Sequence, residues 1–413
     1  MEGEEDVRDN MWRARLDAIL MHKVWGALIF LGLVYLIFFL SFAIGDPLVR
    51  LVQTGTQMFS IWACRLLEPW PGLQSLLGEG VVGGVGGVLA NVVLLFGAIT
   101  VLENSGYMMR VSRLMSRIMK IMGLNGSSFA PLLLGFGCSV PAILSTRRIE
   151  GRNDRLVTIA ILPMMSCAGR LPIYMMFVSA LFPSHLQATV LFGIYAAGIL
   201  LALLCARLLK NTFFKTVQRD SPHRLKKLRI PSLRKVGLLM WSRAFMYVRK
   251  AGTFILGASI ILWFLNTYPR PEEGTVENAA AAMEHSYAGQ IGHWMEPVTR
   301  VAGFDWKVNS ALLGAFAAKE IFVTQMGILY AVQDGDSGAE AQQTLNARLK
   351  ASYTPLQGIS IMIFCLIALP CIGTVTVAKR EAGTWWFALA QFTGLTLMGF
   401  VAATVVYQAG LLM

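Results

Sequence analysis

Charged side chains are scarce in this sequence. Asp, Glu, Lys and Arg together make up 15% of the 413 residues, whereas 55% of the residues are hydrophobic. A soluble protein of this length needs more charge to cover its surface, so the composition excludes an ordinary soluble protein. Apolar runs such as 24–45 and 188–209 reach the roughly 20 residues that cross a bilayer as a helix. The sequence therefore predicts an all-α polytopic membrane protein.

Motifs of catalysis and of fixed cofactors are also missing. The sequence contains no phosphate-binding GxxxxGK[ST] motif, no HExxH and no GxSxG. Its six cysteines show neither CxxC nor metal-finger spacing, and its five histidines lie in or beside loops. We therefore expect no enzymatic activity and no permanently bound cofactor.

Positive charge is concentrated in one stretch. Residues 210–250 contain twelve Lys or Arg and a single acidic residue, Asp220. A nucleic-acid-binding segment could have this composition, but beside a membrane span the positive-inside rule predicts a basic cytoplasmic loop. We expect no nucleic-acid partner, and the same rule predicts that residues 1–23 form a cytoplasmic N-terminal segment.

Two interrupted apolar segments conflict with simple membrane crossing. If residues 129–145 crossed, the following loop, 146–155, would carry four arginines to the outside, against the charge rule. A re-entrant or broken helix avoids this, and lipid tolerates such backbone only where protein or a polar cavity surrounds it. Residues 308–331 pose the same problem from the outside, because they hold Lys319 and Glu320 in an apolar context.

The predicted elements form an inverted repeat of helical bundles with two re-entrant or broken segments. The first half contains span 81–102, segment 129–145, and spans 156–181 and 187–209, and the separate span 24–44 precedes it within residues 24–209. The second half, 251–413, contains span 251–267, segment 308–331, and spans 356–377 and 384–408. Inverted repeats with interrupted segments at matching positions indicate a transporter whose site lies near the midplane.

The first interrupted segment carries the sequence LLLGFGCSVPAI, which corresponds weakly to ALLGAFAAKEIF in the second. Its candidate residues are Gly135, Gly137, Cys138, Ser139 and Pro141. Unwinding there frees backbone carbonyls, which can coordinate a cation as it loses water. A tight helix crossing with a buried thiol is the alternative explanation.

The stretch PMMSCAGRLP places Ser166, Cys167 and Arg170 inside a predicted span. A charge near mid-membrane is expensive, so Arg170 is a functional candidate. We expect it to pair with a carboxylate, Glu103 or Glu320, or to cap free carbonyls. A purely structural ion pair explains it equally well.

Two further stretches complete the candidate centre. Lys319 and Glu320 are neighbours on a helix, about 100° apart, so they cannot face the same partner. The stretch LPCIGTVT holds Cys371 and Thr374, and it matches the Cys167 stretch through the pseudo-symmetry. Two thiols facing each other would suit a borderline or soft divalent metal such as Fe(II), not Mg(II) or Ca(II).

At these residues the sequence resembles the membrane domain of the FeoB family of bacterial ferrous iron transporters. LENSGYMMR (102–110) resembles that family's LEDSGYMAR, and MSCAGRLPIY resembles MSCSARLPVY. GFGCSVPAILSTRRIEGRNDRL and LPCIGTVTVAKREAG likewise resemble its two Gate regions. The family's acidic or amide side chains are replaced by Asn104, Ser116 and Ser139.

The resemblance implies an α-helical permease for Fe(II) in the bacterial inner membrane, with a cytoplasmic N-terminus. By position, Cys138 and Cys167 are the Gate thiols, with Cys371 in the second Gate. The family normally begins with a GTPase domain, whereas about 23 residues precede the first span here. We therefore expect a permease without its own GTPase. Either a GTPase or FeoA-like subunit serves it in trans, or its transport is not gated by nucleotide. We also expect that it can form a homo-oligomer.

Two other functions remain open from the sequence. A carrier for a nucleoside-like organic solute would bind that solute through Arg170, Lys319 and Glu320. A non-transporting membrane subunit would instead recruit a partner through residues 210–250.

Overall fold

The computed structural model describes residues 107–214, 257–269, 279–330 and 338–412, with isolated positions elsewhere. These residues form helices, and no strand occurs among them. Four helical segments are long and apolar enough to cross a membrane: Arg152–Leu181, Ser184–Thr212, Pro355–Ala382 and Trp385–Leu411. They match the spans predicted at 156–181, 187–209, 356–377 and 384–408. The predicted all-α membrane fold class is confirmed.

Several predicted features lie outside the described residues. These are spans 24–44 and 81–102, Glu103 and most of the basic loop 210–250. Of predicted span 251–267, the described part is an apolar helix at Gly257–Thr267, which is shorter than a membrane crossing.

The chain divides into two units. The first contains residues 1–55, 89–162 and 203–249, and the second contains 56–88, 163–202 and 250–413. The predicted repeats divide the chain by residue order, whereas these units group residues that contact one another. Residues 163–202, from the first predicted repeat, thus belong to the same unit as the second repeat.

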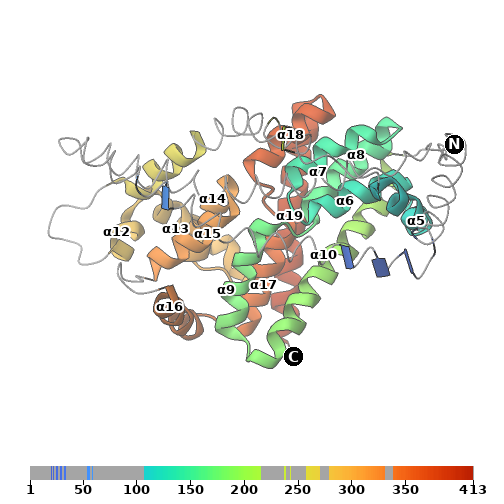
Figure 1. The fold of residues 1–413 in the computed structure, drawn as a ribbon. Helices are drawn as coiled ribbons and strands as arrows, with labels where there is room; N and C mark the ends of the chain where they lie inside the picture. The colour runs from blue at the N-terminus through green and yellow to red at the C-terminus, as the bar shows by residue number, and fades with distance from the viewer. Residues whose placement is uncertain are drawn as a thin grey trace, which may run out of the picture. The chain divides into compact units, whose positions relative to one another are not determined.

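The first unit contains the first interrupted segment (Figure 1). Its described elements are α5 (Tyr107–Ile121), η2 (Gly126–Ser128), α6 (Phe129–Gly135), α7 (Ser139–Ser145), η3 (Thr146–Arg148) and α8 (Arg152–Ile161). Helices α6 and α7 have seven residues each and pack against one another, while α5 packs on α6 and η2. The segment 129–145 is therefore two short helices and not one span.

A buried ion pair ties the first unit together. Lys210 Nζ, in the last turn of α10 (Ser184–Thr212), lies 2.6 Å from Asp154 Oδ1 in the first turn of α8. Each charge sits at the helix end that its sign favours. Next to it, the Thr158 hydroxyl donates to the Ser128 hydroxyl at 2.9 Å and so joins α8 to η2.

The second unit holds most of the other described helices. They are η5 (Ala168–Arg170), α9 (Leu171–Leu181), α12 (Ala279–His285), α13 (Tyr287–Thr299), η6 (Arg300–Ala302), α14 (Trp306–Ala317), α15 (Lys319–Leu329), α16 (Gly338–Ser352), α17 (Pro355–Ile367), α18 (Ile372–Ala382) and α19 (Trp385–Leu411). Helices α14 and α15 pack as a hairpin, α13 packs on α14, and α17 lies beside α19 (Figure 1).

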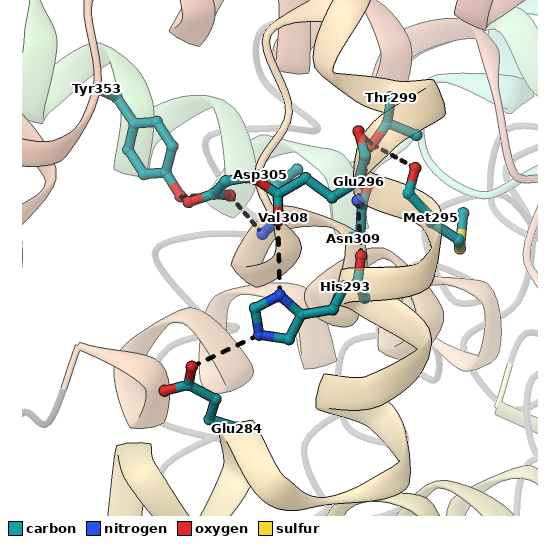
Figure 2. Close-up of polar contacts among 10 residues, drawn as sticks. Glu284, His293, Met295, Glu296, Thr299, Asp305, Val308, Asn309 and Tyr353 are labelled. Carbon is teal, nitrogen blue, oxygen red and sulfur yellow. Dashed lines mark hydrogen bonds and ion pairs between the residues drawn. The ribbon is translucent and has the colours of Figure 1, made fainter.

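Polar contacts fix the start of α14 (Figure 2). The Asp305 carboxylate accepts the Val308 N–H and the Tyr353 hydroxyl, each at 2.9 Å. Burial, and next the Asp305 charge, raises the pKa of Tyr353 well above its ordinary value, so the phenol stays protonated and donates. The Asn309 amide donates to the Gly292 carbonyl and the Thr299 hydroxyl, which joins α14 to α13.

A second set of contacts in Figure 2 joins α12 to α13. The two ring nitrogens of His293 face different carboxylates, with Nε2 3.5 Å from Glu284 Oε1 and Nδ1 3.6 Å from Glu296 Oε2. The same ring stacks on Trp306, with 4.7 Å between the ring centroids. Because Glu284 belongs to α12 and His293 to α13, this contact connects the two helices.

The four candidate spans are of two kinds. Those at Arg152–Leu181 and Pro355–Ala382 are interrupted near the middle, and most of their apolar stretch is buried in the protein. Helices α10 and α19 are continuous, and little of their apolar stretch is buried; Phe192 and Leu204 on α10 and Leu397 and Val401 on α19 are exposed. Irregular backbone inside a membrane needs protein around it, whereas an apolar helix face suits lipid.

Helix α19 approaches the interruption between α17 and α18 very closely. A Cβ added at Gly399 would lie 2.8 Å from the Cβ of Ala368 and 3.1 Å from its backbone nitrogen. Only glycine allows this approach without moving backbone. By contrast, Gly394 on the same helix has nothing within 4 Å of an added Cβ.

Breaking the buried ion pair should destabilise the first unit. We expect Asp154→Asn or Lys210→Met each to lower the free energy of unfolding by about 3–5 kcal/mol, because the partner charge stays buried and unpaired. The combined variant should lose less than the sum of the two, as coupled residues do. Thermal and SDS unfolding in detergent measures both effects. Strict additivity would show that the pair does not act as a unit.

Substituting Gly399 should disturb the interruption at Ala368. We expect Gly399→Ala to lower the melting temperature, because the new methyl group meets Ala368. Gly394→Ala should be neutral or slightly stabilising, since alanine is favoured over glycine in a helix by roughly 1 kcal/mol. Thermal unfolding of both variants in detergent provides a matched comparison, and equal melting temperatures would contradict the close approach.

Candidate functional site

Four helix interruptions share one local geometry. Each contains a residue in extended conformation that starts the next helix. These residues are Cys138 (φ −154°, ψ 132°), Cys167 (φ −75°, ψ 162°), Ala318 (φ −149°, ψ 137°) and Cys371 (φ −61°, ψ 157°). Three of the four are cysteines, and none of the four side chains makes a hydrogen bond that caps the helix it precedes.

The first and third interruptions correspond to each other, but the backbone pairs their residues one position away from the pairing that the motifs suggest. Placing the two motifs side by side pairs Cys138 with Ala317. The backbone instead pairs Cys138 with Ala318, because these two residues have the same extended conformation. Ser139 and Lys319 are then the first residues of equivalent helices.

The first interruption lies in the first unit. The carbonyl of Leu134 accepts the N–H groups of Gly137 and Cys138, at 3.0 and 3.1 Å. Among the described residues, no hydrogen bond is made to the carbonyls of Gly135 and Gly137. The Cys138 side chain is partly exposed, whereas Ser139 and Pro141 are buried. This segment therefore places free carbonyls beside a thiol.

Arg170 serves the second interruption, in the second unit. Its guanidinium is buried, and Nη1 donates to the carbonyl of Met165 at 3.1 Å. Within the described part of the chain it forms no ion pair, and its Nε has no partner. Of the two roles predicted for Arg170, the observed hydrogen bond therefore corresponds to the capping of a backbone carbonyl. Nearby, the Ser166 hydroxyl donates to the hydroxyl of Tyr174 at 3.0 Å.

Lys319 contacts a carbonyl at the fourth interruption, as Arg170 does at the second. Its side chain is buried, and Nζ lies 3.4 Å from the carbonyl oxygen of Ala368. The next residue, Leu369, has φ of +53°, a left-handed conformation that is strained for a side chain of this kind. At the far side of the interruption, Cys371 Sγ lies 3.1 Å from Thr374 Oγ1.

Glu320 points elsewhere, as expected for a helical neighbour of Lys319. A Cβ added at Gly169 would lie 2.9 Å from Glu320 Oε1, so this carboxylate rests against the loop that follows Cys167. Helix α15 packs against η5 at this point. Glu320 is partly exposed, whereas Lys319 is 5% exposed.

These interruptions bring their ionisable groups into one region of the second unit. The Cys167 thiol lies close enough to interact electrostatically with Arg170, Lys319, Glu320 and Cys371. Sequence reasoning missed one member, the fully buried Cys365, which also interacts with Lys319 and Arg170. Its position one turn before the Ala368 interruption on α17 was the available signal. Glu103 lies outside the described residues.

The described part of this region contains no preformed metal cluster. Among the described residues, no three His, Cys, Asp or Glu side chains are placed to hold one metal ion. A cation there would have to be held by thiols together with backbone carbonyls, and those ligand types suit transient binding of a soft or borderline ion.

Comparison with protein families supports this view of the chain. The Gate family model, described as nucleoside recognition, matches residues 85–181 and 248–385, and the model of the ferrous iron transport protein B C terminus matches 191–243. No solved structure matches the chain significantly.

Curated relatives carry ferrous iron transport names. A Fe(2+) transport protein A/Fe(2+) transporter FeoB fusion protein from Porphyromonas gingivalis is 36% identical, over 96% of this chain and 51% of its own length. The Fe(2+) transporter FeoB of Campylobacter jejuni is 35% identical, over 95% and 64%. That of Staphylococcus aureus strain COL is 37% identical, over 96% and 59%. The chain thus spans between about half and two thirds of the length of these relatives. It belongs to the Gate family and corresponds to the membrane part of FeoB-type proteins.

Proposed function

We propose that this chain is a permease for Fe(II) in the bacterial inner membrane, with its N-terminus in the cytoplasm. The observation that carries the proposal is the placement of Cys167 and Cys371 at two helix interruptions that lie close together in one unit. The relatives named Fe(2+) transporter support Fe(II) as the ion. They do not favour the nucleoside-like solute.

The chemistry of the interruptions suits this ion. Fe(II) is borderline soft, so it accepts thiolate as well as oxygen ligands. Each interruption offers a thiol or a carbonyl from backbone that has left its helix, and carbonyls replace water around a dehydrating ion. Few ligands at each point favour release, which a conducting site needs as much as binding. In this proposal Fe(II) is the transported substrate, and the chain itself is not an enzyme.

A partner protein is part of the proposal. The Porphyromonas gingivalis relative combines a transport protein A and FeoB in one chain. We infer that a FeoA-like protein binds this chain in trans, on the basic cytoplasmic residues between 210 and 250. Co-purification of a FeoA-like protein with the chain tests this. We expect the complex to be lost when the Lys and Arg residues of 215–235 are replaced by Gln, and retention would contradict the inference.

Transport is tested by uptake of Fe(II) into liposomes under anaerobic conditions. We expect the chain to take up Fe(II), Cys167→Ser and Cys371→Ser each to reduce the rate at least about tenfold, and the double variant to be no worse than the stronger single one. Residues that act as a unit are not additive. Cys138→Ser tests the thiol of the first interruption in the same assay.

Cys205→Ser is the control for the thiol variants. Cys205 lies on the continuous helix α10, outside every interruption, so its loss should leave the uptake rate unchanged. Unchanged Fe(II) flux in the Cys167, Cys371 and Cys138 variants would eliminate the thiol role. No uptake of any divalent metal by the wild-type chain and its partner would eliminate the permease.

A further inference from the structure

The ammonium group of Lys319 is poorly satisfied for a buried charge. It carries three protons, and its one hydrogen bond within the described part of the chain is the 3.4 Å contact to the Ala368 carbonyl. That distance is longer than the usual range for such bonds. Burying a charge with so few hydrogen-bond partners costs free energy, and buried charges in membrane segments are therefore candidates for a functional role.

The surroundings of this ammonium are the ligands of a soft cation. The side chains of Cys167 and Cys371, at two interruptions, and of Cys365, on α17, lie within electrostatic range of Lys319. Its direct partner is a carbonyl exposed by the end of α17. The strained backbone of Leu369 shapes the same loop, directly after that carbonyl.

The other charges do not explain why a lysine is there. Arg170 is a second buried cation, which repels Lys319, and its own hydrogen bond goes to Met165. The neighbouring Glu320 carboxylate forms no ion pair with either cation among the described residues, and it rests against Gly169. Lys319 therefore stays in a region of excess positive charge, held by one carbonyl.

We propose that the Lys319 ammonium is a tethered cation, which occupies an ion-binding position at the Ala368 carbonyl and must be displaced by the permeating divalent ion. The inference rests on the proposed cation transport and deepens it. An incoming ion takes the Ala368 carbonyl and the thiols, and the ammonium moves toward the partly exposed Glu320. When the ion leaves, the ammonium returns and prevents rebinding.

Two consequences follow from competition for one position. The measured affinity for the ion is reduced by the fraction of time for which the lysine occupies the site, so an occupancy of about 90% weakens binding about tenfold. Removing the ammonium should strengthen ion binding and slow ion release. A lysine with a merely structural role would do the opposite, because its removal would only damage the site.

The first test compares Lys319→Met with Lys319→Arg in the full chain. Co(II) serves as the probe, since its thiolate complexes absorb in the near ultraviolet. We expect Lys319→Met to lower the Kd for Co(II) about tenfold, whereas Lys319→Arg, which keeps a tethered cation, stays near the wild type. In liposomes Lys319→Met should lower both KM and the maximal rate of Fe(II) uptake. Lys350→Met, at an exposed lysine of α16, is the matched control.

The second test uses the wild-type chain, so it does not depend on a variant that folds. Acetylation of lysines is followed by mass spectrometry with and without Co(II). We expect Lys319 to be protected without Co(II) and to react several-fold faster when Co(II) is bound, while Lys350 reacts equally under both conditions.

Each outcome bears on one claim. The tethered cation is overturned if a folded Lys319→Met variant binds Co(II) no more tightly than the wild type, or if Co(II) does not alter the reactivity of Lys319. In that case Fe(II) uptake by the wild-type chain would still support the proposed permease function. A wild-type protein that neither binds Co(II) nor transports Fe(II) overturns both. Tighter binding in Lys319→Met together with released Lys319 in the wild type supports the inference.

Discussion

A carbonyl that leaves a helix inside a membrane needs a partner, because lipid offers no hydrogen bond. The described part of this protein contains four such places, and the rest of its architecture deals with them. The interrupted segments Arg152–Leu181 and Pro355–Ala382 are mostly buried, while the continuous helices α10 and α19 expose their apolar faces. Two of the carbonyls, those of Met165 and Ala368, are capped by Arg170 and Lys319.

This solution places two positive charges where a cation is proposed to pass. In the second unit they accompany the thiols of Cys167, Cys365 and Cys371 and the carboxylate of Glu320. A fixed positive charge would close the path to a divalent ion. A charge at the end of a flexible lysine stem can instead exchange with the ion at the same carbonyl, and so the barrier becomes part of the transport cycle. Arg170 is less suited to this exchange, because its guanidinium caps a carbonyl of its own segment.

The surrounding helices hold the interruptions in position. Asp305 and Asn309 anchor the start of α14, the helix that precedes Lys319, to Tyr353 and α13. On another side, Gly399 lets α19 touch the backbone of Ala368. The Ala368 carbonyl, which accepts the lysine hydrogen bond, is thus held in place by a packed helix. The thiols and the carboxylate lie around the ammonium, and among the described residues they form no fixed metal cluster.

The sequence by itself determined the class of the protein and marked the candidate residues of its site. Low charge and long apolar runs required a membrane protein, and glycine, proline and buried charges marked the segments that could not be plain spans. The Gate motifs pointed to the family. These are local properties of composition and order, so no tertiary contact is needed to detect them.

Tertiary structure alone decided the partners of these residues. The sequence could not choose between a carboxylate and a carbonyl for Arg170, because both are compatible with a buried guanidinium and the choice depends on which group folding brings within hydrogen-bonding distance. For the same reason it did not reveal Cys365, or the pairing of Lys319 with Ala368, which lies 49 residues away. It also aligned Cys138 with Ala317, whereas the extended backbone makes Ala318 its counterpart. Contacts between distant segments and the φ and ψ angles of a helix break arise only when the helices pack.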